Sequence, residues 1–223
     1  MKVRTSNRRN FFFTLSKRIS AIVIAIIFPS LKLQGAHLQR RNQNDPDAWF
    51  NNLKGKHKIV FDAIGANDGF QIVWAHTFLS TNNQLGIADS DLGVMVVLRN
   101  KAIGLAMQHE VWKKYKLGKF FKVNETTTNT PALRNPFLDP DEGEMPEMGM
   151  SIKALMKRGV LFCVCETAIR VSTHQIASAS NLKQEDVKKD WLAGVIPGIQ
   201  AVPSGVLALN RAQERGASYC YAG

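Results

Sequence analysis

The sequence predicts an α/β domain, a three-layer sandwich in which a five-stranded, mostly parallel sheet lies between helices on both faces. Three observations support this fold class. The composition is that of a globular protein, with 45% hydrophobic and 21% charged residues. Short apolar runs rich in β-branched and aromatic residues recur along the chain. Helical patterns separate these runs, which is typical of parallel strands joined by helical crossovers. The expected strands are 57–63, 93–98, 160–165, 198–202 and 217–221.

The first strand and helix follow from a change in the spacing of apolar residues. His57–Ala63 reads as a buried strand, and Gly65–Gly69 breaks it. A helix is expected from Asp68 to Asn82, with Asp68 as its N-cap. The apolar residues of this segment recur at helical spacing and predict the face that packs on the sheet. They are Phe70, Val73, Trp74, Thr77 and Phe78.

The rest of the chain alternates in the same way. Gly93–Leu98 is apolar throughout, as expected for a strand covered on both faces. The strand Val160–Cys165 leads into a long helix that ends at Asn181. Other helices are expected at 102–107, 110–117, 151–157, 184–192 and 206–215, and Pro203–Gly205 forms a turn.

Two segments do not fit this alternation. Residues 37–56 are polar and predict a linker or a short leading helix at 45–53. Residues 120–149 contain four prolines, and five acidic residues lie between 139 and 147. They predict an inserted, Pro-rich acidic loop that is solvated and is either mobile or a lid. A calcium loop is the alternative, but the acids lack the ligand spacing of an EF-hand.

The N-terminus resembles a twin-arginine export signal. Arg8 and Arg9 precede Phe11–Phe13, and an apolar run of about 13 residues follows, which is short for a membrane-spanning helix. Residues 1–36 are therefore expected to be an export signal, cleaved near Gly35 or Ala36 or else retained as an uncleaved anchor. A twin-arginine signal implies a bacterial-type cell, a periplasmic or otherwise extracytoplasmic location, and the twin-arginine translocase as a partner during export.

The charge of the chain belongs mostly to this leader. The net charge is +11, from 29 Lys+Arg and 18 Asp+Glu. Residues 1–36 hold seven basic and no acidic residues, which leaves 22 basic and 18 acidic residues in the remainder. The mature domain is thus nearly neutral, and no nucleic-acid partner is expected.

Chemistry is expected where the parallel strands end, because ligands of such sheets bind beyond the carboxyl ends of the strands. Four segments meet there: Ile64–Gly69, Arg99–Lys101, Cys165–Thr167 and Pro203–Gly205. The polar and small residues expected to line a ligand crevice are Asn67, Asp68, Arg99, Glu166, Thr167, Ser204 and Gly205. No dinucleotide, nucleoside-triphosphate, hydrolase or zinc-protease motif is present, and no cofactor is expected.

Cys165 is the leading candidate for reactivity. It ends a strand and precedes a helix, whose free N–H groups and dipole favour a thiolate. Arg170 on the same helix adds positive charge. Cys163 points to the same face but lies deeper, as a packed core thiol. Cys220 leaves an odd thiol in an exported chain, and its pairing with either of the others stays open. The Cys-x-Cys pair lacks the further ligands of a zinc site, so no metal is expected.

Three stretches together resemble the DsrE/DsrF-like family of small sulfur-relay proteins. They are the opening strand His57–Ala63 with its helix, the Gly-led strand Arg158–Cys165, and the turn, helix and strand of Val202–Tyr219. The resemblance covers residues 57–223, with 120–149 as an insertion. It implies a five-stranded parallel sheet, a homo-oligomer, and a persulfide on Cys165, with Cys163 as the fallback. A thiol or sulfur-donor protein is the implied partner. The sequence departs from the family in its export signal, because the partners of sulfur-relay proteins act in the cytoplasm.

Three functions follow as hypotheses. The first is an exported protein that carries sulfane sulfur on Cys165. The second is a non-catalytic module of the same fold that binds a small ligand or a partner. The third is an exported structural subunit whose role is oligomerisation. Whether the protein turns over a substrate stays open. The solvent exposure of Cys165 discriminates between these hypotheses, because full burial would favour the second and third.

Overall fold

The computed structural model describes residues 47–125, 128–140 and 148–223. The expected export signal and the first part of the expected linker, 37–46, lie outside the described residues, as do the acidic positions 141–147. Within the part of the chain that is described, no helix has both the length and the apolar character needed to cross a bilayer.

The domain is built on one five-stranded sheet, and all of its strand pairs are parallel. The spatial order is β4-β3-β2-β1-β5. Every residue of the central strand β2 is buried, as its continuous apolar sequence predicted. The predicted α/β fold class is therefore confirmed. The strands are β1 (His57–Ala63), β2 (Leu92–Leu98), β3 (Leu161–Cys165), β4 (Gln200–Val202) and β5 (Ser218–Tyr221).

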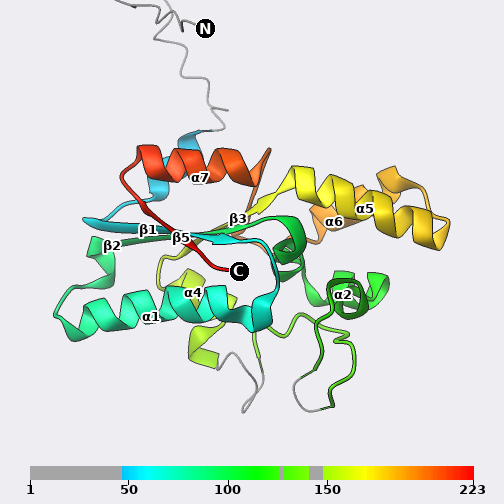
Figure 1. Ribbon diagram of the computed structural model, residues 1–223, viewed down its shortest axis with the longest axis horizontal. Helices are drawn as coiled ribbons and strands as arrows, with labels where there is room; N and C mark the ends of the chain where they lie inside the picture. The colour runs from blue at the N-terminus through cyan, green and yellow to red at the C-terminus, as the bar shows by residue number, and fades with distance from the viewer. Residues whose placement is uncertain (1–46, 126–127, 141–147) are drawn as a thin grey trace, which may run out of the picture. The chain divides into compact units, whose positions relative to one another are not determined.

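Helices cover both faces of the sheet, which gives the three layers (Figure 1). Helix α7 (Gly205–Glu214) lies on one face, and α1 (Phe70–Gln84) and α4 (Ile152–Lys157) lie on the other. Alternate residues of the strands enter two separate cores: Val60 and Met95 pack toward α7, whereas Phe61 and Val96 pack with the α1 side. The other helices are α2 (His109–Tyr115), α3 (Leu117–Phe121), α5 (Glu166–Ser180) and α6 (Gln184–Ala193).

The domain begins before residue 57, so the expected linker is too long. Of the two alternatives for this segment, the short leading helix is observed, as a 3-10 helix at Ala48–Asn52. Phe50 and Leu53 are buried in the core beneath α7. These apolar side chains pack the segment onto the domain because their burial stabilises it, although most of the residues around them are polar.

Helix α1 packs through a different face from the one predicted. Ile72, Ala75 and Leu79 are buried, whereas Phe70 is 48% and Trp74 is 37% exposed. Asp68 is not the N-cap, because it lies in a 3-10 turn with positive φ and the N-cap of α1 is Gly69. The prediction failed because α1 carries apolar residues on both sides, so their spacing alone could not identify the buried side. In α5, the apolar residue Val171 is likewise 51% exposed.

The described part of 120–149 is partly packed on the domain, whereas residues 128–131 are exposed. Helix α3 extends to Phe121, and Phe137 is buried without belonging to a regular element. Asn135 is fully buried and donates hydrogen bonds to the carbonyl oxygens of Leu105 (2.9 Å) and Met107 (2.8 Å). Such bonds replace the regular ladders that the prolines prevent.

Candidate functional site

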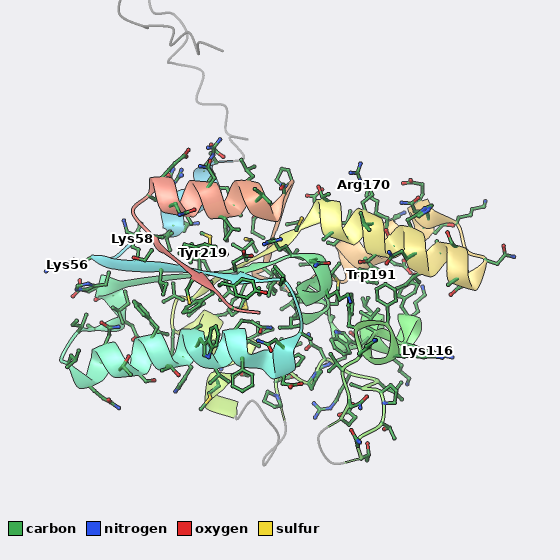
Figure 2. All side chains as sticks on the ribbon, in the orientation of Figure 1. Lys56, Lys58, Lys116, Arg170, Trp191 and Tyr219 are labelled. Carbon is green, nitrogen blue, oxygen red and sulfur yellow. The ribbon has the colours of Figure 1, made fainter. Side chains whose placement is uncertain are left out.

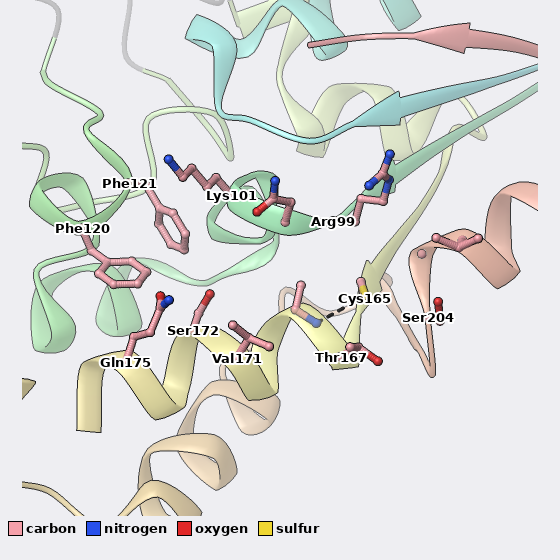
Figure 3. A pocket seen from close by; sticks show the side chains of 14 residues that line it. Arg99, Lys101, Phe120, Phe121, Cys165, Thr167, Val171, Ser172, Gln175 and Ser204 are labelled. Carbon is pink, nitrogen blue, oxygen red and sulfur yellow. Dashed lines mark hydrogen bonds between the residues drawn. The ribbon is translucent and has the colours of Figure 1, made fainter. Parts of the chain in front are cut away.

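A cavity of about 410 Å³ opens beyond the carboxyl ends of β2, β3 and β4 (Figure 3). Three of the four predicted segments, Arg99–Lys101, Cys165–Thr167 and Pro203–Gly205, contribute residues to its wall. The sheet brings them together because these strands are neighbours and run parallel, so their carboxyl ends share one edge.

Cys165 lies at one end of this cavity. It is the last residue of β3 and the N-cap of the 15-residue helix α5, and its sulfur accepts a hydrogen bond from the backbone N–H of Ala168 at 3.4 Å. The residue is 6% exposed, and that surface faces the cavity. The sulfur therefore lies at the N-terminus of α5, where the free N–H groups and the positive end of the helix dipole are found.

The other two cysteines do not share this environment. Cys163 is fully buried in the core beneath α7, and burial raises the pKa of its thiol. Cys220 lies on edge strand β5 and packs toward the α1 side of the sheet, opposite to Cys163. All three thiols are free. Pairing of Cys220 with Cys163 is excluded in this fold, because the sheet separates the two side chains.

Arg99 supplies a positive charge fixed in place beside the cavity. Its Nε and Nη2 donate hydrogen bonds to the two carboxylate oxygens of Asp62, at 2.6 and 2.8 Å. Asp62 is 1% exposed and also accepts a hydrogen bond from the Tyr219 hydroxyl at 2.8 Å. The hydrogen bond to Asp62 raises the pKa of Arg99, and the charge of Cys165 acts in the same direction. Arg99 is therefore a permanent cation within electrostatic reach of the thiol.

Gly205 makes room for the Arg99 side chain. A Cβ at position 205 would lie 2.8 Å from Cβ and 3.0 Å from Cδ of Arg99. Both distances are shorter than ordinary contacts between carbon atoms. Gly205 is needed here for close packing rather than for its backbone angles, and it lets the first turn of α7 approach the end of β2.

Two hydroxyl groups border the Cys165 end of the cavity. Thr167 donates a hydrogen bond to the carbonyl oxygen of Pro203 at 2.9 Å, which ties the start of α5 to the turn before α7. The Ser204 hydroxyl has no hydrogen-bond partner among the described residues, and Ser204 lines the cavity near Cys165 (Figure 3). Ser204 is therefore available to a ligand, whereas Thr167 has a structural role.

The far end of the cavity was not predicted. Phe120 and Phe121 of α3 form its wall, and Val171, Ser172 and Gln175 continue along one side of α5 (Figure 3). The sequence signal for this side was the spacing of Thr167, Val171 and Gln175, which places them on one helix face. The contribution of α3 had no such signal, because it depends on how distant segments pack.

Three expected crevice residues lie outside the cavity wall. Asn67 and Asp68 are exposed in the turn after β1, where the Asn67 side chain donates to the carbonyl oxygen of Ala222 and so holds the end of β5. Glu166 is half-buried in the first turn of α5. Arg170 is exposed on the outer side of α5 (Figure 2), so it adds no charge beside Cys165. Arg99, rather than Arg170, is the arginine that lines the cavity together with Cys165.

Within the described ranges, no three His, Cys, Asp or Glu side chains are grouped as a metal site requires. The class of protein defined by fold and site is thus a parallel α/β domain with a cysteine at a strand end, next to a cavity lined by basic and aromatic residues.

Comparisons with known proteins add little to this description. No family model matches the chain, and no curated protein matches it significantly. Among solved structures, the chain is similar to MTH1491 from Methanobacterium thermoautotrophicum, described as a protein of unknown function. The identity is 14% and the TM-score is 0.39, over 74% of this chain and 98% of that one.

Proposed function

We propose that this protein is an exported carrier of sulfane sulfur that holds the sulfur as a persulfide on Cys165. The observation that carries the proposal is the position of the Cys165 sulfur. It lies at the N-terminus of α5, at the end of a 410 Å³ cavity, within electrostatic reach of Arg99. Cys163 is a poor alternative, because its full burial disfavours the thiolate that attacks sulfur.

The proposed step needs no oxidant or reductant. The Cys165 proton passes to solvent, and the thiolate attacks the terminal sulfur of a persulfide or thiosulfonate donor. A bond forms between the Cys165 sulfur and that terminal sulfur. The donor's bond to the terminal sulfur breaks, and its electron pair leaves with the departing thiolate or sulfinate. A second thiolate, from an acceptor protein or small molecule, then removes the sulfur by the same exchange.

The resemblance to the DsrE/DsrF-like family supports this assignment, since it implies that Cys165 matches the strand-end cysteine that carries the persulfide in that family. Arg99 and the N-terminus of α5 would stabilise the anionic sulfur.

Mass spectrometry tests the proposal directly. After incubation with a sulfane-sulfur donor, the intact protein should gain about 32 Da, the mass of one sulfur atom, and a reductant should remove it. The Cys165→Ser variant should gain nothing, because Ser can cap α5 in the same way but forms no persulfide. The matched control, Cys220→Ser, should behave as wild type. An adduct that persists in Cys165→Ser, or no adduct in wild type, would refute the proposal.

A non-catalytic binding module is the second candidate. The low exposure of Cys165, 6%, favours it, because a bulky protein donor could not reach the sulfur directly. On this hypothesis Cys165→Ser keeps full ligand affinity and the wild type forms no adduct, so the same two proteins discriminate between the candidates.

A further inference from the structure

We infer that the cavity is built for an extended organic sulfur donor, in which an apolar body separates the reacting sulfur from a carboxylate bound by Lys101. This inference names the donor class and so rests on the proposed function. It is carried by the shape, the apolar wall and the charge of the cavity.

The cavity is elongated along α5. Its wall includes Thr167, Val171 and Gln175, which recur every four residues on one side of this helix. At a rise of about 1.5 Å per residue, Thr167 and Gln175 are separated by about 12 Å along the helix axis. The volume of about 410 Å³ is in the range of sites for organic ligands. Inorganic thiosulfate is compact and would fill only the Cys165 end.

The apolar part of the wall lies away from Cys165. Phe120 and Phe121 contact each other edge to face, with ring centroids 4.8 Å apart, and both border the cavity. Val171 faces them across it from α5 and is 51% exposed (Figure 3). A ligand that covered Val171 and Phe120 would remove apolar surface from water, which favours a hydrocarbon or aromatic body at this end.

The charge of the wall is positive at both ends. Arg99 and Lys101 line the cavity, and none of the lining residues described is acidic. Arg99 keeps its charge but is paired with Asp62 through two hydrogen bonds. The Lys101 side chain is exposed and has no acidic partner among the described residues, and it extends toward the Phe121 end (Figure 3). The cation without an acidic partner therefore lies toward the Phe121 end, where it would pair with an anionic tail rather than with the reacting sulfur.

Three ligands of increasing size test the inference: thiosulfate, benzenethiosulfonate and para-carboxybenzenethiosulfonate. Their dissociation constants should be measured by calorimetry on the full-length Cys165→Ser protein, in which no sulfur transfer occurs. The phenyl group should tighten binding about tenfold over thiosulfate. The carboxylate should tighten binding by a further three- to fivefold, about the contribution expected of a partly exposed ion pair.

Variants assign these gains to the wall. In the Cys165→Ser background, Lys101→Gln should abolish the gain from the carboxylate, whereas Lys119→Gln, an exposed lysine of α3 outside the cavity, should not. Phe120→Ala should weaken both aromatic ligands and leave thiosulfate unchanged. Val171→Thr, which keeps the volume and adds a hydroxyl, should act in the same direction if Phe120→Ala fails to fold.

The inference is overturned if thiosulfate binds as tightly as the aromatic ligands, or if the two lysine variants behave alike. Its failure is distinct from failure of the proposed function. A wild-type adduct on Cys165 that forms equally well from all three donors would keep the carrier and remove the donor class. Graded binding to Cys165→Ser without any wild-type adduct would keep the ligand class and remove the carrier.

Discussion

Replacing Asp62 with asparagine removes the charge that holds Arg99 at the cavity. Asp62 is 1% exposed and accepts three hydrogen bonds, two from Arg99 at 2.6 and 2.8 Å and one from Tyr219 at 2.8 Å. Asparagine keeps the size of the side chain but offers a single acceptor oxygen. The NH₂ group of the asparagine would also face one of the N–H or O–H groups that donate to Asp62, so at least one of the three hydrogen bonds is lost.

The expected loss of stability is substantial. Removing one partner of a fully buried ion pair costs about 3–5 kcal/mol, because the other charge is left uncompensated. The Arg99 side chain is 30% exposed, so water solvates part of its charge. We therefore expect Asp62→Asn to lower the free energy of unfolding by about 2–3 kcal/mol. Tyr219→Phe removes only one bond from a half-exposed hydroxyl and should cost about 1 kcal/mol.

Urea unfolding followed by tryptophan fluorescence measures these losses, provided that the slope of the transition stays constant. The matched control is Asp89→Asn. Asp89 also binds an arginine through two hydrogen bonds, from Nε and Nη2 of Arg158, both at 2.9 Å, but it is 34% exposed. Because this carboxylate is more exposed than that of Asp62, whereas the two arginines are similarly exposed, Asp89→Asn should cost less, about 1 kcal/mol. Equal losses in Asp62→Asn and Asp89→Asn would show that burial of the carboxylate does not set the cost of removing its charge.

Three other changes test separate parts of the structure. Gly205→Ala should displace Arg99 and lower the free energy of unfolding by about 1–3 kcal/mol, because its Cβ would lie 2.8 Å from that side chain. The control Gly65→Ala, whose Cβ would meet nothing closer than 3.9 Å, should change the free energy of unfolding little. Equal urea midpoints for the two variants would contradict the close packing of Gly205 on Arg99. Burial raises the pKa of Cys163 in the folded chain above that of an unfolded thiol, about 8.5. Its contribution to stability is therefore complete below that pH and falls as the pH rises further, by up to about 1.4 kcal/mol per pH unit. Cys163→Ala should flatten the decline measured by urea unfolding between pH 8 and 10, and an unchanged slope would count against the burial. Replacing Arg8–Arg9 with two lysines should trap the chain in the cytoplasm, as measured by cell fractionation, and undiminished export would remove the twin-arginine hypothesis.

The strands could be predicted because a central parallel strand must be apolar on both faces. β2 is a continuous apolar run in the sequence and is wholly buried in the fold. The buried side of helix α1 could not be predicted in this way. Ile72 and Leu79 are buried, whereas the equally apolar Phe70 and Trp74 are exposed. Periodicity cannot choose between two apolar sides of one helix, since that choice depends on which side the sheet occupies.

The candidate site was predictable where it depends on strand ends and not elsewhere. Cys165, Arg99 and Gly205 follow directly from the rule that parallel strands end at one edge. The wall formed by Phe120 does not, because α3 reaches the cavity through tertiary packing of a segment that reads as a loop. The pairing of Arg99 with Asp62 had one signal, an acidic residue in an otherwise apolar strand end, but the sequence could not name its partner.

That acidic residue is best explained by the site rather than by the fold. A buried ion pair contributes little to stability compared with apolar residues of the same volume, because desolvation offsets the attraction between the charges. An apolar residue at position 62 would therefore serve the sheet as well. Asp62 instead fixes a cation 30% exposed beside the cavity and, through Tyr219, connects edge strand β5 to the end of β2. Removing this carboxylate should thus disturb both the end of strand β5 and the wall of the ligand cavity. A purely structural role of Asp62 would not require an effect on the cavity.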